Sequence, residues 1–188
     1  MKIRTLFGLA MAGILLGSCQ SNLYQISGYA KGCQDGDTIC LATDGNDDLI
    51  LAQAVVSNGT FQMTGETDAV SLSRVFSKQK PECGVTFFLE PGHITIELNP
   101  LPDFSRVSGT TVNNEWQKLS DSISILAQDV ERMIKMTAKD STQHIAKTQA
   151  IDSLHRRMSA CILHAGIRNK DNPLGQYIQE NYKAPEFK

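Results

Sequence analysis

Two patterns of apolar residues divide the chain. From Leu23 to about Val107, short runs rich in β-branched and aromatic residues lie between Gly, Asn and Asp, which is typical of β-strands. The runs predict eight strands, at Leu23–Ala30, Thr38–Thr43, Leu49–Ser57, Thr60–Glu66, Val70–Ser77, Val85–Glu90, His93–Asn99 and Phe104–Val107. Strands so closely spaced favour an antiparallel β-sandwich or partial barrel.

Two tight turns punctuate this region. Asn58-Gly59 accepts the positive φ values of a type I′ turn and predicts a hairpin between the flanking strands. In Glu90-Pro91-Gly92-His93, Pro fixes one φ and Gly permits a positive φ next, which predicts a second turn.

The pattern changes to a helical one after Ser108. Apolar residues then follow spacings of three and four, at Trp116, Leu119, Ile123, Leu126, Val130 and Met133. Thr111 is the predicted N-cap, and a break is expected at 137–141. A second stripe comprises Ile151, Leu154, Met158, Cys161 and Ala165 and ends near Gly166. Asn172-Pro173 opens a third helix, with Asn as the cap and Pro at the first helical position.

The predicted fold class is therefore α+β. A β domain over residues 23–110 precedes an antiparallel helical segment over residues 111–188. The stripe from Trp116 to Met133 should be buried, either on the β layer or on the second helix.

The first 22 residues predict export from the cytoplasm and attachment to a membrane. Lys2 and Arg4 precede an apolar run from Leu6 to Leu16, the composition of a signal peptide over residues 1–18. The next residues, Leu16-Gly17-Ser18-Cys19, resemble the lipobox of bacterial lipoproteins, which implies cleavage before Cys19 and acylation of that cysteine, with palmitate among the acyl groups. Residues 19–22 would form the tether, and two or three acyl chains anchor a protein stably. In lipoproteins of the Bacteroidetes type, which this leader resembles, surface export depends on acidic residues just after the cysteine. Residues 20–22 are uncharged, so the resemblance implies an anchor in the periplasm-facing leaflet of the outer membrane.

Composition narrows the function. The chain has 188 residues, a formal net charge of -2, 41% hydrophobic residues and 20% charged residues. Such a chain folds as an ordinary domain, and it lacks the basic footprint of a nucleic-acid-binding protein.

One order of residues resembles a known family. It runs through Ile26-Ser27-Gly28, Gly36-Asp37-Thr38, Ser57-Asn58-Gly59-Thr60-Phe61, Phe87-Phe88-Leu89-Glu90-Pro91-Gly92 and Val107-Ser108-Gly109-Thr110 to Asn113. From Ile26 to about Asn114 it is similar to family 4369 of the domains of unknown function, found in Bacteroidetes-type lipoproteins. The resemblance implies a β domain and helices that usually precede a thioredoxin-like domain of thiol:disulfide interchange proteins. We expect this chain, which ends at Lys188, to correspond to that N-terminal part.

The cysteines do not supply the family's redox motif. The sequence has no Cys-x-x-Cys, the arrangement that yields a reactive thiolate in thioredoxin-like enzymes. Apart from Cys19, the thiols are Cys33, Cys40, Cys83 and Cys161. Cys33 and Cys40 form a cross-strand disulfide if Asp35–Thr38 is a four-residue loop, and stay separate if Asp35-Gly36 is a two-residue turn.

Other chemical sites find little support. Asp44, Asn46 and Asp48 imitate the start of a calcium loop, but the required Gly and Glu do not follow. Cys161 and His164 share a helix face without a second pair of zinc ligands. We expect Glu90 and His93 to stabilise a turn. The sequence thus predicts no catalytic residue, metal or cofactor.

Three functions remain open. The first is a non-catalytic, membrane-anchored envelope module that binds a protein partner or small ligand. The second is an accessory domain for a thiol-disulfide oxidoreductase, with a thioredoxin-like protein as partner. The third is an enzyme whose site is assembled from scattered loops.

Overall fold

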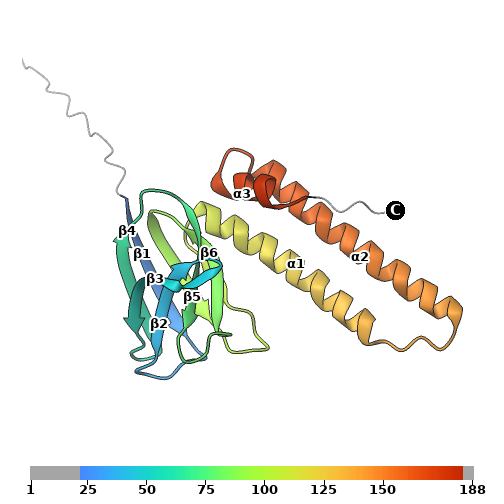
Figure 1. Cartoon of the computed structure of the whole chain (residues 1–188), viewed down its shortest axis with the longest axis horizontal. Helices are drawn as coiled ribbons and strands as arrows, with labels where there is room; N and C mark the ends of the chain where they lie inside the picture. The colour runs from blue at the N-terminus through green and yellow to red at the C-terminus, as the bar shows by residue number, and fades with distance from the viewer. Residues whose placement is uncertain (1–21, 184–188) are drawn as a thin grey trace, which may run out of the picture.

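The structure, a computed structural model, describes residues 22–183 (Figure 1). Over these residues the chain forms a β-sandwich followed by helices. The strands are β1 (Leu23–Ala30), β2 (Thr38–Thr43), β3 (Asn46–Val55), β4 (Thr60–Glu66), β5 (Ser71–Ser77), β6 (Gly84–Leu89), β7 (Gly92–Leu98) and β8 (Arg106–Ser108). The helices are α1 (Thr111–Lys135), α2 (Ser141–Arg168) and α3 (Pro173–Asn181). The α+β class predicted from the sequence is confirmed.

Two four-stranded sheets enclose the main core. One has the order β4-β1-β7-β8 and the other β3-β2-β5-β6. Alternate residues of the strands point between the sheets, as the twofold side-chain period of a strand requires. The largest side chains buried there are Phe87, Ile26, Ile39, Leu41, Ile94, Ile96 and Leu98. Burial of such apolar surface is the main favourable contribution to folding.

The apolar pattern of the sequence predicted the positions of the strands well. The pairing of strands distant in sequence, however, is not purely antiparallel. The bounds of β1, β2 and β4 are those predicted. However, β1 pairs with β7 in parallel, with Ile26 beside Ile94, so this sheet is mixed. The reason is topological, because β7 returns to the first sheet only after β5 and β6 have formed part of the other.

The turn at Asn58-Gly59 has the predicted backbone. Asn58 and Gly59 adopt φ values of 52° and 68°, and Ser57 and Thr60 exchange two backbone hydrogen bonds of 2.9 and 3.1 Å across it. The predicted pairing of the flanking strands stops at Ser57 and Thr60, because β3 and β4 belong to different sheets. Similarly, Gly92 at the second turn has a φ of 123°, and this turn carries the chain from β6 to β7 in the opposite sheet.

Each helix begins at a polar cap that accepts backbone N–H groups. Thr110 caps α1, one residue before the predicted Thr111, because its hydroxyl accepts from the N–H of Asn113. Asp140, within the predicted break, caps α2. Asn172 caps α3 with Pro173 in its first turn, as expected.

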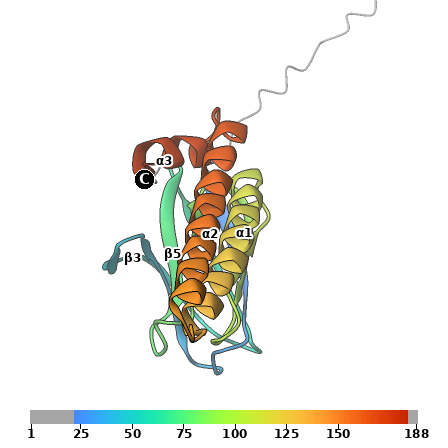
Figure 2. The same ribbon diagram turned by 90° about the vertical axis from the view of Figure 1, so that its right-hand side faces the viewer.

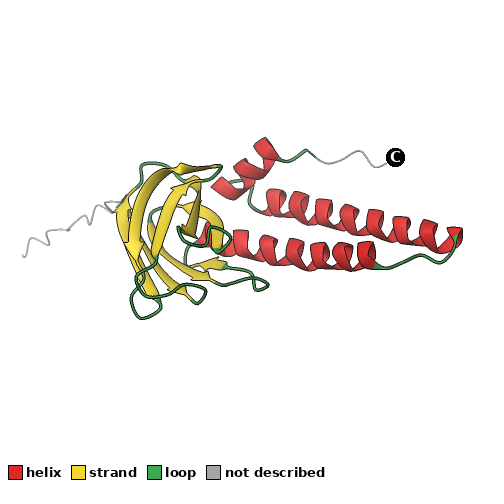
Figure 3. Cartoon of the chain, turned by 60° about the horizontal axis from the view of Figure 1, so that its bottom comes forward, coloured by secondary structure: helices red, strands yellow, loops and turns green. Residues whose placement is uncertain are grey.

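Helices α1 and α2 form a long antiparallel hairpin that projects from the sandwich (Figure 3). In Figure 2 the two helices of the hairpin lie side by side in front of the sandwich, with α3 next to the end of α2. The predicted burial of the α1 stripe is confirmed only for part of it. Leu119 and Leu126 are buried, whereas Ile123, Val130 and Met133 remain half-buried because one neighbouring helix does not cover the whole stripe.

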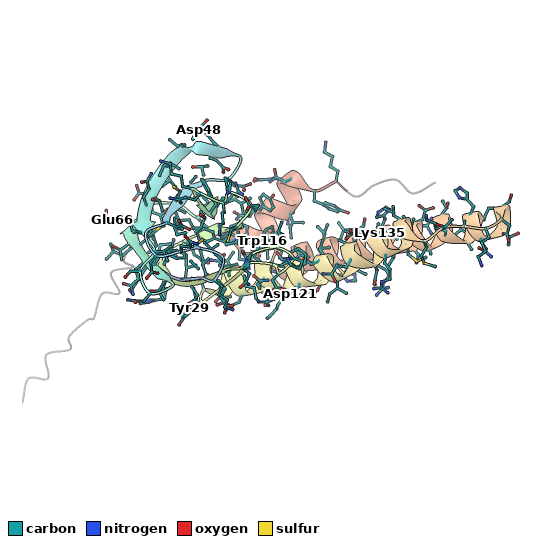
Figure 4. The ribbon with its side chains drawn as sticks, turned by 90° about the horizontal axis from the view of Figure 1, so that it is seen from below. Tyr29, Asp48, Glu66, Trp116, Asp121 and Lys135 are labelled. Carbon is teal, nitrogen blue, oxygen red and sulfur yellow. The ribbon has the colours of Figure 1, made fainter. Side chains whose placement is uncertain are left out.

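Polar contacts fix the root of the hairpin to the sandwich. The indole N–H of Trp116 donates to the carbonyl of Thr86 at 2.8 Å, and Figure 4 places Trp116 at the junction between the two parts. The guanidinium of Arg106 in β8 forms two bonds, of 2.9 and 2.7 Å, with the carboxylate of Asp121 in α1. A two-bond pair of this kind fixes orientation as well as distance.

Candidate functional site

An apolar groove lies at the root of the helical hairpin, where α1, α2 and α3 meet. Its volume is about 400 Å³. The walls are mainly apolar and aromatic, and they comprise Trp116, Leu119, Ile123, Ile162, Tyr177 and Ile178. A few polar groups, from Ser120, Ser124 and Asn181, line it as well. This combination of an apolar wall with sparse polar groups is typical of a binding site.

Three aromatic rings hold one wall of the groove in place. The ring centroids of Phe88, Trp116 and Tyr177 lie 5.6 to 6.1 Å apart, and each pair meets edge to face at 84° to 88°. Edge-to-face pairs stabilise beyond the area that they bury. Because the rings come from β6, α1 and α3, the wall forms only when α3 is seated on the hairpin.

The apolar surface of α1 continues beyond the groove toward the tip of the hairpin. Ile123, Ala127, Val130 and Ile134 follow spacings of four, three and four, which put them on one helix face. Ala127 and Ile134 are exposed, and 59% of the Ile134 surface is open to solvent. The face is therefore covered by α3 at its root and uncovered above it.

The fold brings Cys33 to Cys83, and not to Cys40. Cys33 lies in the loop after β1, and Cys83 lies just before β6. Cys83 is part of the main core, and the half-buried Cys33 packs against that core. Burial, followed by the neighbouring Cys33 sulfur, raises the pKa of the Cys83 thiol to about 11.

Cys40 occupies a different small cluster, with Ala42 and Phe76. Burial raises the pKa of its thiol, while the charge of Lys78 acts in the opposite direction. All four cysteines of the described region are free thiols. The cross-strand arrangement of Cys33 and Cys40 does not form, because β1 and β2 belong to different sheets.

The other residues considered for metal chemistry are dispersed. Asn46 and Asp48 are part of strand β3, and the carboxylate of Asp44 accepts a hydrogen bond from Thr86. Cys161 packs against the apolar cluster that includes Phe88, Leu174 and Ile178. Between residues 22 and 183, no three His, Cys, Asp or Glu side chains are grouped so that they could hold a metal ion.

The surroundings of Glu90 are those of a structural residue in the joint between β6 and α1. Its carboxylate lies 3.5 Å from the side-chain nitrogen of Asn113, next to the N-cap of α1. Burial raises the pKa of Glu90, and hydrogen bonds from Thr110 and Asn113 partly oppose this. The carboxylate thus belongs to the joint between β6 and α1.

Cys19, the predicted lipidation site, lies outside the described residues, so its acylation stays a prediction. Within residues 22–183, no helix combines the length and the apolar character needed to cross a membrane.

Sequence reasoning missed both the groove and the Cys33–Cys83 contact. The sequence does contain an indication of the groove, because Trp116 and Tyr177 are large aromatic residues on two predicted helices. The contact between the two cysteines had none, because it depends on which loops meet at one end of the sandwich.

Comparison with known proteins identifies one domain. Residues 24–116 match the family described as a domain of unknown function, DUF4369. The match ends at Trp116, in the first turns of α1, so it covers the sandwich and its joint to the hairpin. No curated protein matches the chain in sequence.

Proposed function

We propose that this chain, which carries a DUF4369 domain over residues 24–116, is a lipid-anchored envelope protein that acts as a non-catalytic interaction module. Its binding element is the helical hairpin, and its partner is a protein that supplies an amphipathic helix. The sandwich holds the hairpin at a fixed angle, and the acyl chains on Cys19 hold the sandwich at a membrane.

The uncovered apolar face of α1 carries this proposal. Two packed helices bury only the residues between them, and here α3 covers a further strip over nine residues at the root. Beyond α3 the same face of α1 presents Ala127 and Ile134 to solvent. Apolar side chains at such spacings are the anchors by which helices recognise a groove.

The seat of α3 indicates the chemistry of the partner. Helix α3 packs Ile178 against Gly166 and Tyr177 against Trp116, with its capped N-terminus toward the end of α2. The face therefore already accepts an amphipathic helix through aliphatic and aromatic contacts. A partner helix placed end to end with α3 would continue that row over Ile123 and Ala127.

Site-specific photo-crosslinking in cells tests the binding face. A benzophenone amino acid is placed at Ala127, on the uncovered face, and in a second strain at Gln128. Both residues are exposed, but one residue of α-helix turns the side chain by about 100°. We expect a discrete crosslinked protein from position 127 and none from position 128.

A matched pair of substitutions distinguishes binding to this face of α1 from non-specific binding to exposed apolar side chains. Ile134 and Ile125 expose 59% and 63% of their surface, and nine residues put them on opposite sides of α1. Ile134→Glu should abolish the crosslink from position 127, and Ile125→Glu should leave it unchanged. Crosslinks that are equal from both faces, or a product composed of two copies of this chain, would contradict the proposed partner.

The anchor has its own test. Cells grown with labelled palmitate should incorporate the label into the wild-type chain and into Cys161→Ser, but not into Cys19→Ser. Label that persists in Cys19→Ser would refute the lipid anchor without affecting the hairpin proposal.

A second candidate is an accessory role in thiol-disulfide exchange. It draws on the resemblance to the N-terminal part of thiol:disulfide interchange proteins, together with the helical segment that follows the DUF4369 match. In that case the crosslinked protein from position 127 would be a thioredoxin-like protein, which mass spectrometry of the product would identify. An enzyme with an unrecognised site is a third candidate, and no arrangement of reactive groups described above supports it.

A further inference from the structure

Three segments that are distant in sequence meet at one end of the sandwich, around the sulfur of Cys83. The loop after β1 contributes Gly32 and Cys33, the turn between β5 and β6 contributes Lys80 and Cys83, and the segment after β7 contributes Asn99. Because β1 and β7 belong to one sheet and β5 and β6 to the other, both sheets contribute to this end.

Direct contacts fix the two cysteine-bearing segments against each other. The ammonium of Lys80 donates to the carbonyl of Gly32 at 2.7 Å. A Cβ built on Gly32 would lie 3.0 Å from the Cys83 sulfur, so a side chain at position 32 would crowd that thiol. The backbone of Cys33 is held in turn by a bond of 3.0 Å from its N–H to the carbonyl of Ala30.

The two thiols share the resulting space. The side chain of Cys33 packs against the core cluster that includes Cys83, and the Cys83 thiol donates to the carbonyl of Asn99 at 3.5 Å. Cys83 is 2% exposed and Cys33 is half-buried, so a reagent in solvent reaches Cys33 first. Gly32 approaches the Cys83 sulfur and Cys33 follows it directly, so the two cysteines are neighbours in the fold, which is what a disulfide requires.

We propose that Cys33 and Cys83 form an intramolecular disulfide that ties the β1–β2 loop to the β5–β6 turn. The oxidant is a disulfide of a thiol carrier, R–S–S–R. The thiolate of Cys33 attacks it and releases one RS⁻, which leaves Cys33 in a mixed disulfide with R. The thiolate of Cys83 then attacks the Cys33 sulfur and displaces the second RS⁻. The balance is two protein thiols and R–S–S–R giving one protein disulfide and two RSH.

The timing of closure follows from the burial of Cys83. In the folded chain its thiol is poorly ionised and shielded, so the second attack is slow there. While the sandwich is still assembling, Cys83 has an ordinary thiol and the bond closes readily. Residues 33 and 83 are 50 positions apart in the sequence. The bond therefore constrains a long loop of the unfolded chain, which is where disulfides stabilise most.

Mapping of the linked peptides tests the proposal on the full chain. The protein is extracted from membranes in detergent with maleimide present to block free thiols. A second sample is reduced in urea and refolded in the presence of oxidised glutathione, so that the bond can close before Cys83 is buried. Trypsin combined with a protease that cleaves before aspartate separates Cys33 from Cys40, because Asp35 and Asp37 lie between them. We expect a linked pair of peptides that contains Cys33 and Cys83, in the wild type and in Cys40→Ser.

Thermal unfolding supplies a second readout. Oxidised wild-type protein should unfold roughly 5–15 °C above the reduced protein. Cys33→Ser changes the more exposed partner and should remove this difference, while Cys40→Ser and Cys161→Ser should retain it. The proposal is overturned if Cys33 and Cys83 both carry maleimide after oxidation, if Cys33 holds only glutathione, or if Cys33 is linked to Cys40.

Discussion

The side-chain amide of Asn113 forms hydrogen bonds with both the backbone N–H and the backbone C=O of Phe88. The N–H of Phe88 donates to the Asn113 side-chain oxygen at 2.9 Å, and the Asn113 side-chain nitrogen donates to the Phe88 carbonyl at 2.8 Å. Asn113 thus pairs with edge strand β6 as a neighbouring strand would. The pair is fully buried and joins the first turn of α1 to the sandwich.

Replacing Asn113 with Leu should weaken this joint strongly. The change keeps the size of the side chain but leaves the N–H and C=O of Phe88 buried without partners, at a cost of about 3 kcal/mol in the free energy of unfolding. Urea denaturation measures it. Asn114→Ala is the control, because Asn114 accepts one exposed bond from Gly109 and should cost about 1 kcal/mol or less. Equal losses for the two variants would contradict the role given to Asn113.

The raised pKa of Glu90 predicts a pH dependence of stability. Burial raises the pKa of the Glu90 carboxyl in the folded chain above its value in the unfolded chain, which is about 4.3. The resulting stabilisation is complete below the unfolded pKa and is lost as the pH rises through the folded pKa. Glu90→Gln should therefore raise the unfolding temperature at neutral pH and have little effect near about pH 3, where the wild-type carboxyl is also neutral.

The control for Glu90→Gln is the same substitution at Glu66, an exposed residue at the end of β4. Thermal unfolding of the three proteins across the acidic range gives the comparison. A Glu90→Gln variant that is less stable than the wild type at neutral pH would show that the ionised carboxylate is the favoured form.

The helical hairpin provides a test of the predicted stripe. Leu126 is 5% exposed and its neighbour Ile125 is 63% exposed. Leu126→Asp places an unpaired carboxylate among apolar side chains, so we expect the hairpin to unfold, with a large loss of helical circular dichroism at 222 nm. Ile125→Asp should retain the wild-type helicity. A Leu126→Asp protein with the wild-type signal and midpoint would show that this stripe does not stabilise the hairpin.

The elements that local chemistry controls were predictable from the sequence. Asn58 and Gly59 specify their turn because both must adopt positive φ, and Asn172 with Pro173 specifies the start of α3. The bounds of β1 follow from its own alternation. Each of these features depends on residues within a few positions of one another.

The partners across the fold were not predictable in the same way. Nothing near Ile26 indicates that Ile94 will lie beside it in a parallel pair. The contact of Cys33 with Cys83 has the same origin, since it follows from the pairing of whole strands and not from spacing. The groove was predictable only in part. The sequence predicts amphipathic helices, but it does not show that α3 covers only part of the apolar face of α1.

Removal of Tyr177 should release α3 from the groove. Its ring meets both Phe88 and Trp116 edge to face, so Tyr177→Ala loses two aromatic contacts and opens the groove wall, at about 3 kcal/mol for the seating of α3. Trp116 is the single tryptophan of the chain, so its fluorescence should shift to longer wavelength as water reaches it. Gln176→Ala, one exposed residue earlier in α3, should leave the spectrum unchanged. If Tyr177→Ala also leaves it unchanged, α3 is held by Leu174 and Ile178 alone, and the aromatic wall is not what positions it.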